Sequence, residues 1–197
     1  MSILDELNVE QRKAAEKIEG PVLILAGAGS GKTRTVTYRI AHMIKEMGIS
    51  PLNILALTFT NKAAKEMKER AEQLVGSDSH NLAISTFHSF AVRLLKTYAD
   101  RIGYGRNFNI YDVDDQKSLI GKIIKELNIN SDEISPSKVA NRISKLKEDG
   151  IGVKELEKEI DVKLYSNRIF YDIYKQYDST LRANNAMDFS DLLLNAR

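Results

Sequence analysis

A stretch near the N-terminus, VLILAGAGSGKT at positions 22–33, joins an apolar run to a glycine-rich loop and a Lys-Thr pair. Glycines let the backbone adopt positive φ and approach a ligand closely. Successive N–H groups of such a loop converge on phosphate oxygens, aided by the positive end of the following helix. Lys32 would neutralise the β- and γ-phosphates of a nucleotide, and the Thr33 hydroxyl would hold the Mg²⁺ that bridges them. The pattern therefore predicts a phosphate-binding loop.

The loop departs from the strict G-x-x-x-x-G-K-[ST] pattern at its first position, where Ala26 replaces glycine. Alanine is small enough to fit there. The alternative interpretation is an ordinary glycine-rich turn between a strand and a helix. The apolar run and the Lys-Thr pair favour the phosphate loop instead. The predicted loop residues are Ala26, Gly27, Ala28, Gly29, Ser30, Gly31, Lys32 and Thr33.

Composition is typical of a folded globular protein, because 43% of the 197 residues are hydrophobic and 28% are charged. The chain has no cysteine, which excludes a disulfide framework, a thiolate metal site and a cysteine nucleophile. The formal net charge of +2 neither requires nor excludes nucleic acid, since a local basic groove is sufficient. Neither a signal peptide nor a run of the ~20 apolar residues of a membrane span is evident. We expect no membrane partner and a cytoplasmic location.

Apolar periodicity predicts an α/β core in the first half of the chain. A helix is expected over residues 2–19. Three strand-then-helix units follow, which imply a parallel sheet with right-handed crossovers. The expected strands cover 22–25, 54–59 and 82–85, and the helices cover 32–47, 62–75 and 86–99. In such a sheet, ligands bind at the carboxyl ends of the strands.

The pattern changes after Tyr111, because no convincing strand is found between residues 112 and 185. Helices are predicted there over 114–127, 136–147 and 164–182, which together indicate an all-helical insertion. Asp188 is predicted to cap a final helix over 189–196 rather than to bind a metal. An ATPase of the phosphate-loop class also needs an acidic strand end to hold Mg²⁺. None follows Thr33, so either the site is incomplete or the chain is part of a longer protein.

Five segments, in order, resemble the motifs of superfamily 1 DNA helicases of the UvrD/Rep/PcrA type. Leu7–Gln11 resembles the glutamine motif, and Ala26–Thr33 resembles motif I, including its leading alanine. Leu57–Ala64 resembles motif Ia and Ile84–Ser89 resembles motif Ib. Met187–Leu192 resembles the segment shortly before the Walker B strand. The resemblance covers the whole chain and weakens in the helical insertion.

This resemblance implies a P-loop NTPase fold of the RecA-like kind, with a parallel sheet covered by helices on both faces. Residues 1–111 would form the first part of the ATP-binding subdomain 1A. Residues 112–185 would form the all-helical inserted subdomain 1B. Residues 186–197 would return toward subdomain 1A and stop before Walker B.

The family also implies ATP and Mg²⁺ as cofactors. Gln11 would read the adenine edge through its amide, and Arg34 would lie against the base, where a planar guanidinium stacks well. Lys32 and Thr33 keep the catalytic and Mg²⁺-binding roles given above. The alternative for Gln11 is a capping-box partner of Asn8 at a helix start.

Single-stranded DNA is the implied substrate, with Phe59 as a stacking platform. The implied DNA-binding residues are Phe59, Thr60, Asn61, Thr86 and His88. From the residues alone, the favoured interpretation of Phe59 is the last core residue of its strand. His88 could equally be a histidine of the helix surface or core.

Two patterns in the insertion also have alternative interpretations. The basic residues Lys138, Arg142, Lys145 and Lys147 could contact duplex DNA, but a solvated helix face is the default expectation. The tyrosines 171, 174 and 177 could form a stacking ladder for bases. A helix face packed on the core of the insertion is favoured for them instead.

The function implied is that of an ATP-dependent DNA helicase that couples ATP hydrolysis to movement on single-stranded DNA and to unwinding, in DNA repair or replication. Its partners would be single-stranded DNA, ss/ds junctions, and repair or replication proteins. Residues 1–197 alone would be inactive, because Walker B and the second motor domain are missing. The alternatives are the motor portion of a helicase–nuclease subunit, a stand-alone P-loop nucleotide-binding module or small-molecule kinase, and a non-catalytic DNA-binding module.

Overall fold

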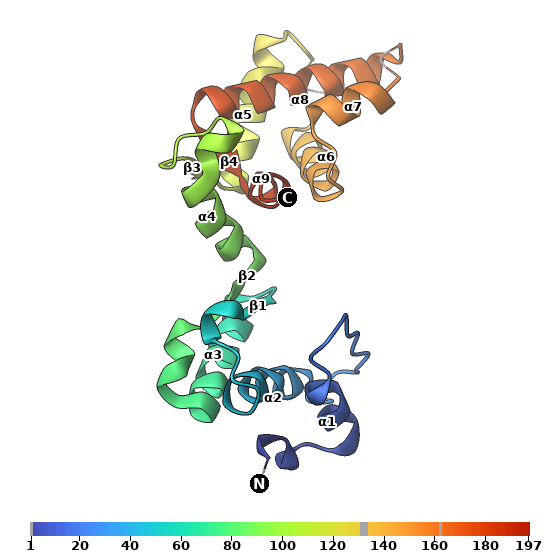
Figure 1. The fold of residues 1–197 in the computed structure, drawn as a ribbon. Helices are drawn as coiled ribbons and strands as arrows, with labels where there is room; N and C mark the ends of the chain where they lie inside the picture. The colour runs from blue at the N-terminus through green and yellow to red at the C-terminus, as the bar shows by residue number, and fades with distance from the viewer. Residues whose placement is uncertain (1, 131–133, 162) are drawn as a thin grey trace. The chain divides into compact units, whose positions relative to one another are not determined.

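A computed structural model describes residues 2–130, 134–161 and 163–197 of the chain (Figure 1). The protein is a mixed α/β structure that is mostly helical, and its described strands form two parallel two-stranded sheets. By its internal contacts the chain divides into two compact units, residues 1–87 and 88–197. The subdomain boundaries inferred at residues 111 and 185 stay predictions.

The first unit has a main apolar core and a second, smaller one beneath its N-terminal segment. Strands β1 and β2 pair in parallel, from Leu55 opposite Ala83 to Thr58 opposite Thr86. Apolar side chains of α2, α3 and both strands fill the main core. The elements are η1 (Ile3–Glu6), α1 (Val9–Glu16), α2 (Lys32–Lys45), η2 (Pro51–Asn53), β1 (Leu55–Thr58), α3 (Asn61–Val75), η3 (Gly76–Asn81) and β2 (Ala83–Thr86).

Two helix starts in this unit differ from the prediction. The single helix expected over 2–19 is interrupted, because Asn8 adopts an extended conformation and caps α1 after the 3-10 helix η1 has ended. Helix α3 begins at Asn61, one residue before the expected start at 62, and its cap is Thr60. The Thr60 side chain accepts a hydrogen bond from the Ala63 amide at 3.1 Å, which places Asn61 inside the first turn.

The strand predicted over residues 22–25 does not form, and this expectation was wrong. Residues 21–27 carry no assigned secondary structure, and Leu23 and Leu25 are 83% and 87% exposed. A parallel strand is held by hydrogen bonds to a neighbouring strand. In the described part of the chain, β1 and β2 pair only with each other. The run has strand-forming residues but pairs with no strand in the described part of the chain.

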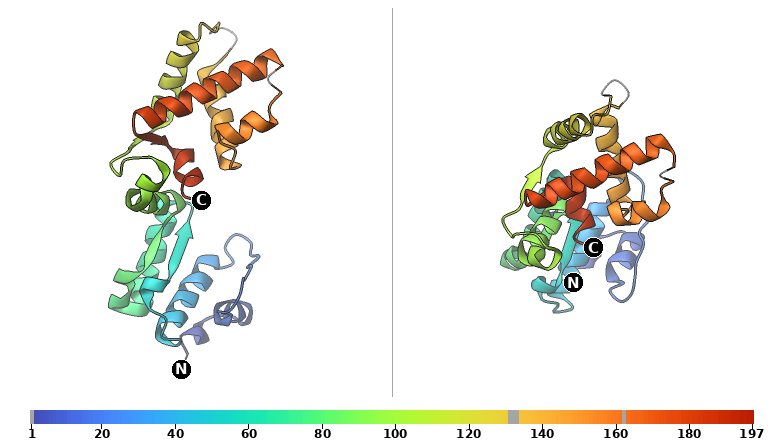
Figure 2. Two further views of the ribbon diagram at one scale, coloured as in Figure 1. Left: turned by 45° about the horizontal axis from the view of Figure 1, so that its top comes forward. Right: turned by 90° about the horizontal axis from the view of Figure 1, so that it is seen from above.

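The second unit is a group of helices with a short parallel sheet at one side. Strand β3 pairs with β4, from Asn109 opposite Ala186 to Tyr111 opposite Asp188. The long helix α8 packs against α5 and α7 (Figure 2). The elements are α4 (Phe87–Tyr98), η4 (Ala99–Ile102), β3 (Asn109–Tyr111), α5 (Val113–Glu126), α6 (Pro136–Glu148), α7 (Val153–Glu159), α8 (Tyr165–Ala183), β4 (Ala186–Asp188) and α9 (Phe189–Leu194). Helix α7 was not predicted.

The three tyrosines of α8 belong to the core of this unit. Tyr171 is 8% exposed, and Tyr174 and Tyr177 are fully buried among apolar residues of α5, α6 and α7. The core interpretation is therefore confirmed, and a stacking ladder for bases is wrong.

In the described residues, no helix is both long and apolar enough to cross a membrane.

Candidate functional site

The glycine-rich loop forms a tight bend directly before α2. Gly29 and Gly31 have φ values of +76° and +84°, a region that residues with a Cβ rarely adopt. The Ser30 hydroxyl closes the bend by donating to the Gly27 carbonyl at 2.8 Å. Gly31 occupies the N-cap position of α2, where no side-chain hydrogen bond caps the helix. The first amides of α2 are thus left without a side-chain acceptor, an arrangement suited to an anion.

Lys32 folds back over this bend. Its Nζ donates to the Ala26 carbonyl at 3.0 Å and to the Gly27 carbonyl at 2.7 Å. The positive charge is therefore held at the loop by neutral carbonyl oxygens, which a phosphate group could replace with stronger, charge-assisted hydrogen bonds. Thr33 follows in the first turn of α2 and is half-buried.

Gln11 caps the start of α1 and also contacts the glycine-rich loop. Its backbone N–H donates to Asn8 Oδ1 at 2.9 Å, and its side-chain Oε1 accepts from the backbone N–H of Asn8 at 3.3 Å. These two bonds confirm the capping box. Its Nε2 also donates to the Ser30 carbonyl at 3.0 Å, so the side chain reaches the loop. A Cβ at Gly31 would lie 2.7 Å from Gln11 Nε2 and 3.9 Å from Arg34 Cβ. Gln11 and Arg34 therefore lie together at the start of α2.

Hydrogen bonds join the N-terminal segment to α2 at several points along the helix. At the far end, Glu46 accepts from the Ile3 amide at 2.7 Å and from the Ser2 hydroxyl at 3.0 Å. The bond from Ile3, supported by His42, lowers the pKa of the Glu46 carboxyl. In the middle, Arg39 donates to the Ala14 carbonyl at 2.7 Å. These contacts position the segment that carries Gln11.

Two cavities border the loop. One of about 510 Å³ is lined by Gly31 and Arg34 and extends to α3. The other, of about 330 Å³, is lined by Gln11, Ser30 and Lys32. Together with the open amides of α2, these groups are the donors that a triphosphate and a purine edge require. The residues present therefore fit ATP, and the Thr33 hydroxyl would be the group to hold the accompanying Mg²⁺.

Residues predicted to bind DNA gather where β1 and β2 end. Thr58 and Thr86 lie opposite each other in the last pair of the sheet. Phe59 is 88% exposed, and its ring centroid is 5.3 Å from that of Phe87. Phe59 is therefore not a core residue. Asn61 is exposed beside it.

The remaining candidates for DNA contact are buried, half-buried or already hydrogen-bonded within the protein. Thr86 is 7% exposed, and the Thr60 hydroxyl already caps α3. His88 belongs to the second unit, where its half-buried ring contacts Phe189 edge-on, with centroids 6.1 Å apart. The structure thus brings Phe59, Asn61 and Thr86 to one sheet edge and does not place His88 relative to them.

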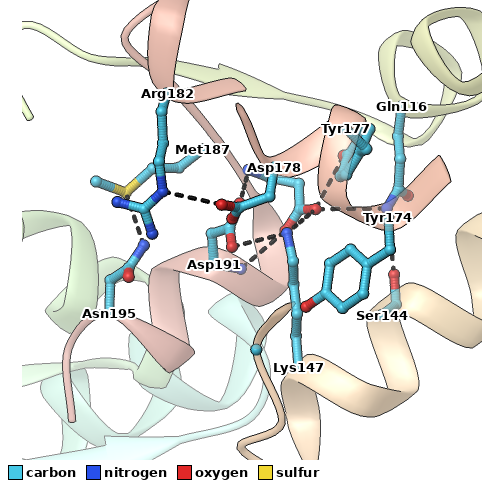
Figure 3. A network of polar contacts seen from close by, with 12 residues as sticks. Gln116, Ser144, Lys147, Tyr174, Tyr177, Asp178, Arg182, Met187, Asp191 and Asn195 are labelled. Atoms are coloured by element: carbon cyan, nitrogen blue, oxygen red, sulfur yellow. Dashed lines mark hydrogen bonds and ion pairs between the residues drawn. The ribbon is translucent and has the colours of Figure 1, made fainter. Parts of the chain in front are cut away.

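Lys147 differs from both predictions made for it, a solvated helix face and a contact with duplex DNA. Its side chain is 0% exposed and makes two ion pairs, with Asp188 Oδ2 at 2.7 Å and Asp191 Oδ1 at 2.7 Å. Tyr177 donates to the same Asp188 oxygen at 2.9 Å, and Gln116 approaches it at 3.4 Å (Figure 3). Lys147 is therefore neither a solvated residue nor a DNA contact. It ties α6 to β4 and α9.

The position of Lys147 could have been found from helical spacing. Val139, Ile143 and Lys147 recur every four residues, so they share one face of α6, and that face is buried. The other three basic residues, at 138, 142 and 145, are exposed. Asp188 caps α9 as predicted, because its Oδ1 accepts from the Asp191 amide at 2.8 Å.

Fold and site together define a mixed α/β protein that carries a glycine-rich Lys-Thr loop at the start of a helix. The chain belongs to the UvrD/REP helicase N-terminal domain family, whose model matches residues 7–197. It is 46% identical over 193 residues to "ATP-dependent DNA helicase PcrA" of Staphylococcus aureus (strain Mu50). The same identity and length are found with the protein of this name from Staphylococcus epidermidis (strain ATCC 12228).

Each of these alignments covers 98% of this chain and 26% of the relative. The chain thus spans about a quarter of the length of the curated relatives it matches. The family relationship confirms the resemblance drawn from the five motifs.

Proposed function

We propose that these residues are the N-terminal, ATP-binding part of an ATP-dependent DNA helicase that moves along single-stranded DNA. The observation that carries the proposal is the convergence of Gln11 and Lys32 on the bend at Gly29–Gly31, with Arg34 in the adjoining first turn of α2. Gln11 reaches the loop through Ser30, and Lys32 lies over the loop carbonyls. The relatives bearing the name ATP-dependent DNA helicase PcrA support the same activity.

The proposed fold is RecA-like, with the loop and the β1–β2 pair as parts of one larger parallel sheet that has helices on both faces. Residues 1–111 would belong to subdomain 1A, residues 112–185 to the helical subdomain 1B, and residues 186–197 to the return into 1A. The parallel register of β1 and β2 supports this arrangement.

The chemistry of the chain's own residues is positional and electrostatic. The loop amides and Lys32 would bind the phosphates and stabilise the negative charge that develops on transfer. Gln11 would distinguish adenine through an amide that both donates and accepts. Thr33 would hold the Mg²⁺ ion, which supplies charge neutralisation between the β- and γ-phosphates when bound.

The DNA track would begin at the carboxyl edge of β1 and β2. Phe59 offers an exposed ring on which an unpaired base can stack, an interaction worth about 1–3 kcal/mol per base. Thr60, Asn61 and Thr86 would contact the strand around it, and His88 is proposed as a further DNA-binding residue. Junctions of single- and double-stranded DNA, repair or replication proteins, and a cytoplasmic location are proposed together with this substrate.

The motor portion of a helicase–nuclease subunit is the second candidate, because it would share the loop and the DNA edge. A nuclease domain elsewhere in the protein would distinguish it. A stand-alone nucleotide-binding module would have no use for the exposed Phe59–Phe87 pair beside the sheet edge.

The proposal is tested by replacing Lys32 in the full-length natural protein that contains this sequence. We expect Lys32→Ala to lower DNA-stimulated ATP hydrolysis by roughly a hundredfold or more, the usual effect of removing a group that stabilises transition-state charge. Lys45→Ala, at the exposed far end of the same helix, is the matched control and should hydrolyse ATP at the wild-type rate. Equal rates in the two variants would show that the loop is not the ATP site.

A further inference from the structure

Arg34 is held in place from two directions by contacts within the protein. Its Nη2 donates to the Glu6 backbone carbonyl at 3.0 Å and lies 3.5 Å from Glu6 Oε2. Its Cζ lies 5.2 Å from the centroid of the Tyr38 ring, one turn further along α2. The guanidinium therefore has a cation–π neighbour on its own helix and oxygen neighbours on the N-terminal segment.

Tyr38 is the rigid member of this cluster. It is 8% exposed, belongs to the small core beneath the N-terminal segment, and donates its hydroxyl hydrogen bond to the Glu6 carboxylate. That hydrogen bond and burial both raise the pKa of the Tyr38 hydroxyl, which keeps it protonated and donating. The side chains of Glu6 and Arg34 are 64% and 48% exposed, and an exposed ion pair orders its partners little by itself.

The same cluster borders the space beside the glycine-rich loop. The cavity of about 510 Å³ is lined by Gly31, Arg34, Tyr38 and Glu6. Glu6 also lies only five positions before Gln11 in the chain. The Tyr38–Glu6 bond thus joins α2, which carries Arg34, to the segment that carries Gln11.

We propose that Tyr38 is a positioning residue for the nucleotide base, acting through Arg34 and Glu6. The inference rests on the proposed function, in which Arg34 and Gln11 contact adenine. A free arginine side chain loses rotamer entropy when a ligand orders it. An arginine ordered beforehand by Tyr38 loses less, and binding is correspondingly tighter. The triphosphate, which is bound by the loop amides and Lys32, gains nothing from Tyr38.

The experiment separates the base from the phosphates by comparing ATP with inorganic triphosphate in the natural full-length protein. Tyr38→Leu removes both the ring and the hydroxyl. We expect it to weaken ATP binding roughly fivefold, as the loss of a cation–π contact does. It should leave triphosphate binding and the turnover rate at saturating ATP unchanged. Tyr38→Phe keeps the ring and should weaken ATP binding by about twofold, because only the hydroxyl hydrogen bond is lost.

The matched control is Tyr174→Phe in the second unit. Tyr174 is a buried tyrosine whose hydroxyl donates to the Ile151 carbonyl at 3.2 Å. Loss of this hydroxyl hydrogen bond should lower stability about as much as its loss at Tyr38. It should leave the ratio of ATP affinity to triphosphate affinity at the wild-type value.

The inference is overturned if the Tyr38 variants weaken ATP and triphosphate equally, or if neither changes their ratio. If Tyr38→Leu fails to fold, the ratio measured for Tyr38→Phe decides. A wild-type protein that binds no ATP would overturn the proposed function itself. ATP binding by the wild type with an unchanged ratio in the variants would reject only the role of Tyr38.

Discussion

Gly31 shows how a single missing side chain shapes the candidate site. Its φ of +84° would strain any residue with a Cβ, and a Cβ there would lie 2.7 Å from Gln11 Nε2. Gly29 has a similar φ of +76°, but a Cβ at that position meets nothing within 4 Å. A side chain at Gly29 would therefore cause backbone strain alone, whereas one at Gly31 would also displace the Gln11 side chain.

The first prediction uses this pair. Gly31→Ala should abolish the preference for ATP over GTP, because the new methyl group pushes the Gln11 amide away from the loop. Gly29→Ala should lower nucleotide affinity through backbone strain of about 1–2 kcal/mol while the preference is retained. Competition binding with both nucleotides measures the two effects, and an ATP preference that survives in Gly31→Ala would contradict the placement of Gln11.

Lys147 provides a second prediction. Lys147→Met keeps the side-chain volume but leaves Asp188 and Asp191 facing each other without a cation. We expect a loss of about 3–5 kcal/mol in the free energy of unfolding, the usual cost of breaking a buried ion pair. Lys145→Met, exposed on the same helix, should stay within about 0.5 kcal/mol of the wild type. Urea unfolding followed by circular dichroism measures both, and equal losses would be inconsistent with the buried network.

The same network predicts a pH dependence. Burial raises the pKa of Asp191 to about 6, although Lys147 opposes the shift and the charge of Asp188 adds to it. In the unfolded chain this carboxyl titrates near 3.9. Between these values the folded state binds more protons than the unfolded state, so the contribution of Asp191 to stability falls as the pH rises from about 4 to above 6.

This decline should amount to about 2–3 kcal/mol. Asp191→Asn, which cannot titrate, should lack it, so the difference in unfolding free energy between wild type and variant shrinks as the pH rises. Lys147 on α6 and Asp188 on β4 face the group, and Tyr177 on α8 donates to Asp188. All three should be left intact. Parallel stability curves for the two proteins from pH 4 to 7 would argue against the shift.

At the scale of elements, the run at residues 22–25 differs most from expectation. Its residue types favour a strand, yet no described strand pairs with it. Helix α2 and the β1–β2 pair form nearby because their partners are all present within the first unit. Strand structure therefore depends on neighbours more than helix structure does.

Hydrogen exchange checks this interpretation in the chain of residues 1–197. Amides of residues 22–25 should exchange rapidly, whereas those of β1 should be protected by pairing with β2. Comparable protection of both segments would show that the run pairs after all.

At the scale of the whole molecule, the chain spans about a quarter of its curated relatives. We expect residues 1–197 by themselves to bind nucleotide weakly at best and to show neither DNA-stimulated ATP hydrolysis nor unwinding. The acidic Mg²⁺ ligand and the arginines that complete a phosphoryl-transfer site are not among the residues assembled at the loop. Robust DNA-stimulated turnover by this chain would contradict the expectation.

Much of the site could be read from residue order. The spacing of Gly29, Gly31 and Lys32 predicted the loop, and the position of Asn8 predicted the cap that also involves Gln11. The contact of Gln11 with Ser30, the hydrogen bond of Tyr38 to Glu6 and the ion pairs of Lys147 with Asp188 and Asp191 could not be read in this way. Each joins residues distant in the chain.

The sequence by itself determined the properties that depend on near neighbours: where most helices start and stop, which loop can bend around an anion, and to which family the chain belongs. Only the tertiary structure decided which strands find a partner and which charges are buried. Strand pairing and ion burial are decided by what another part of the chain places opposite a residue, and that information lies outside any local pattern.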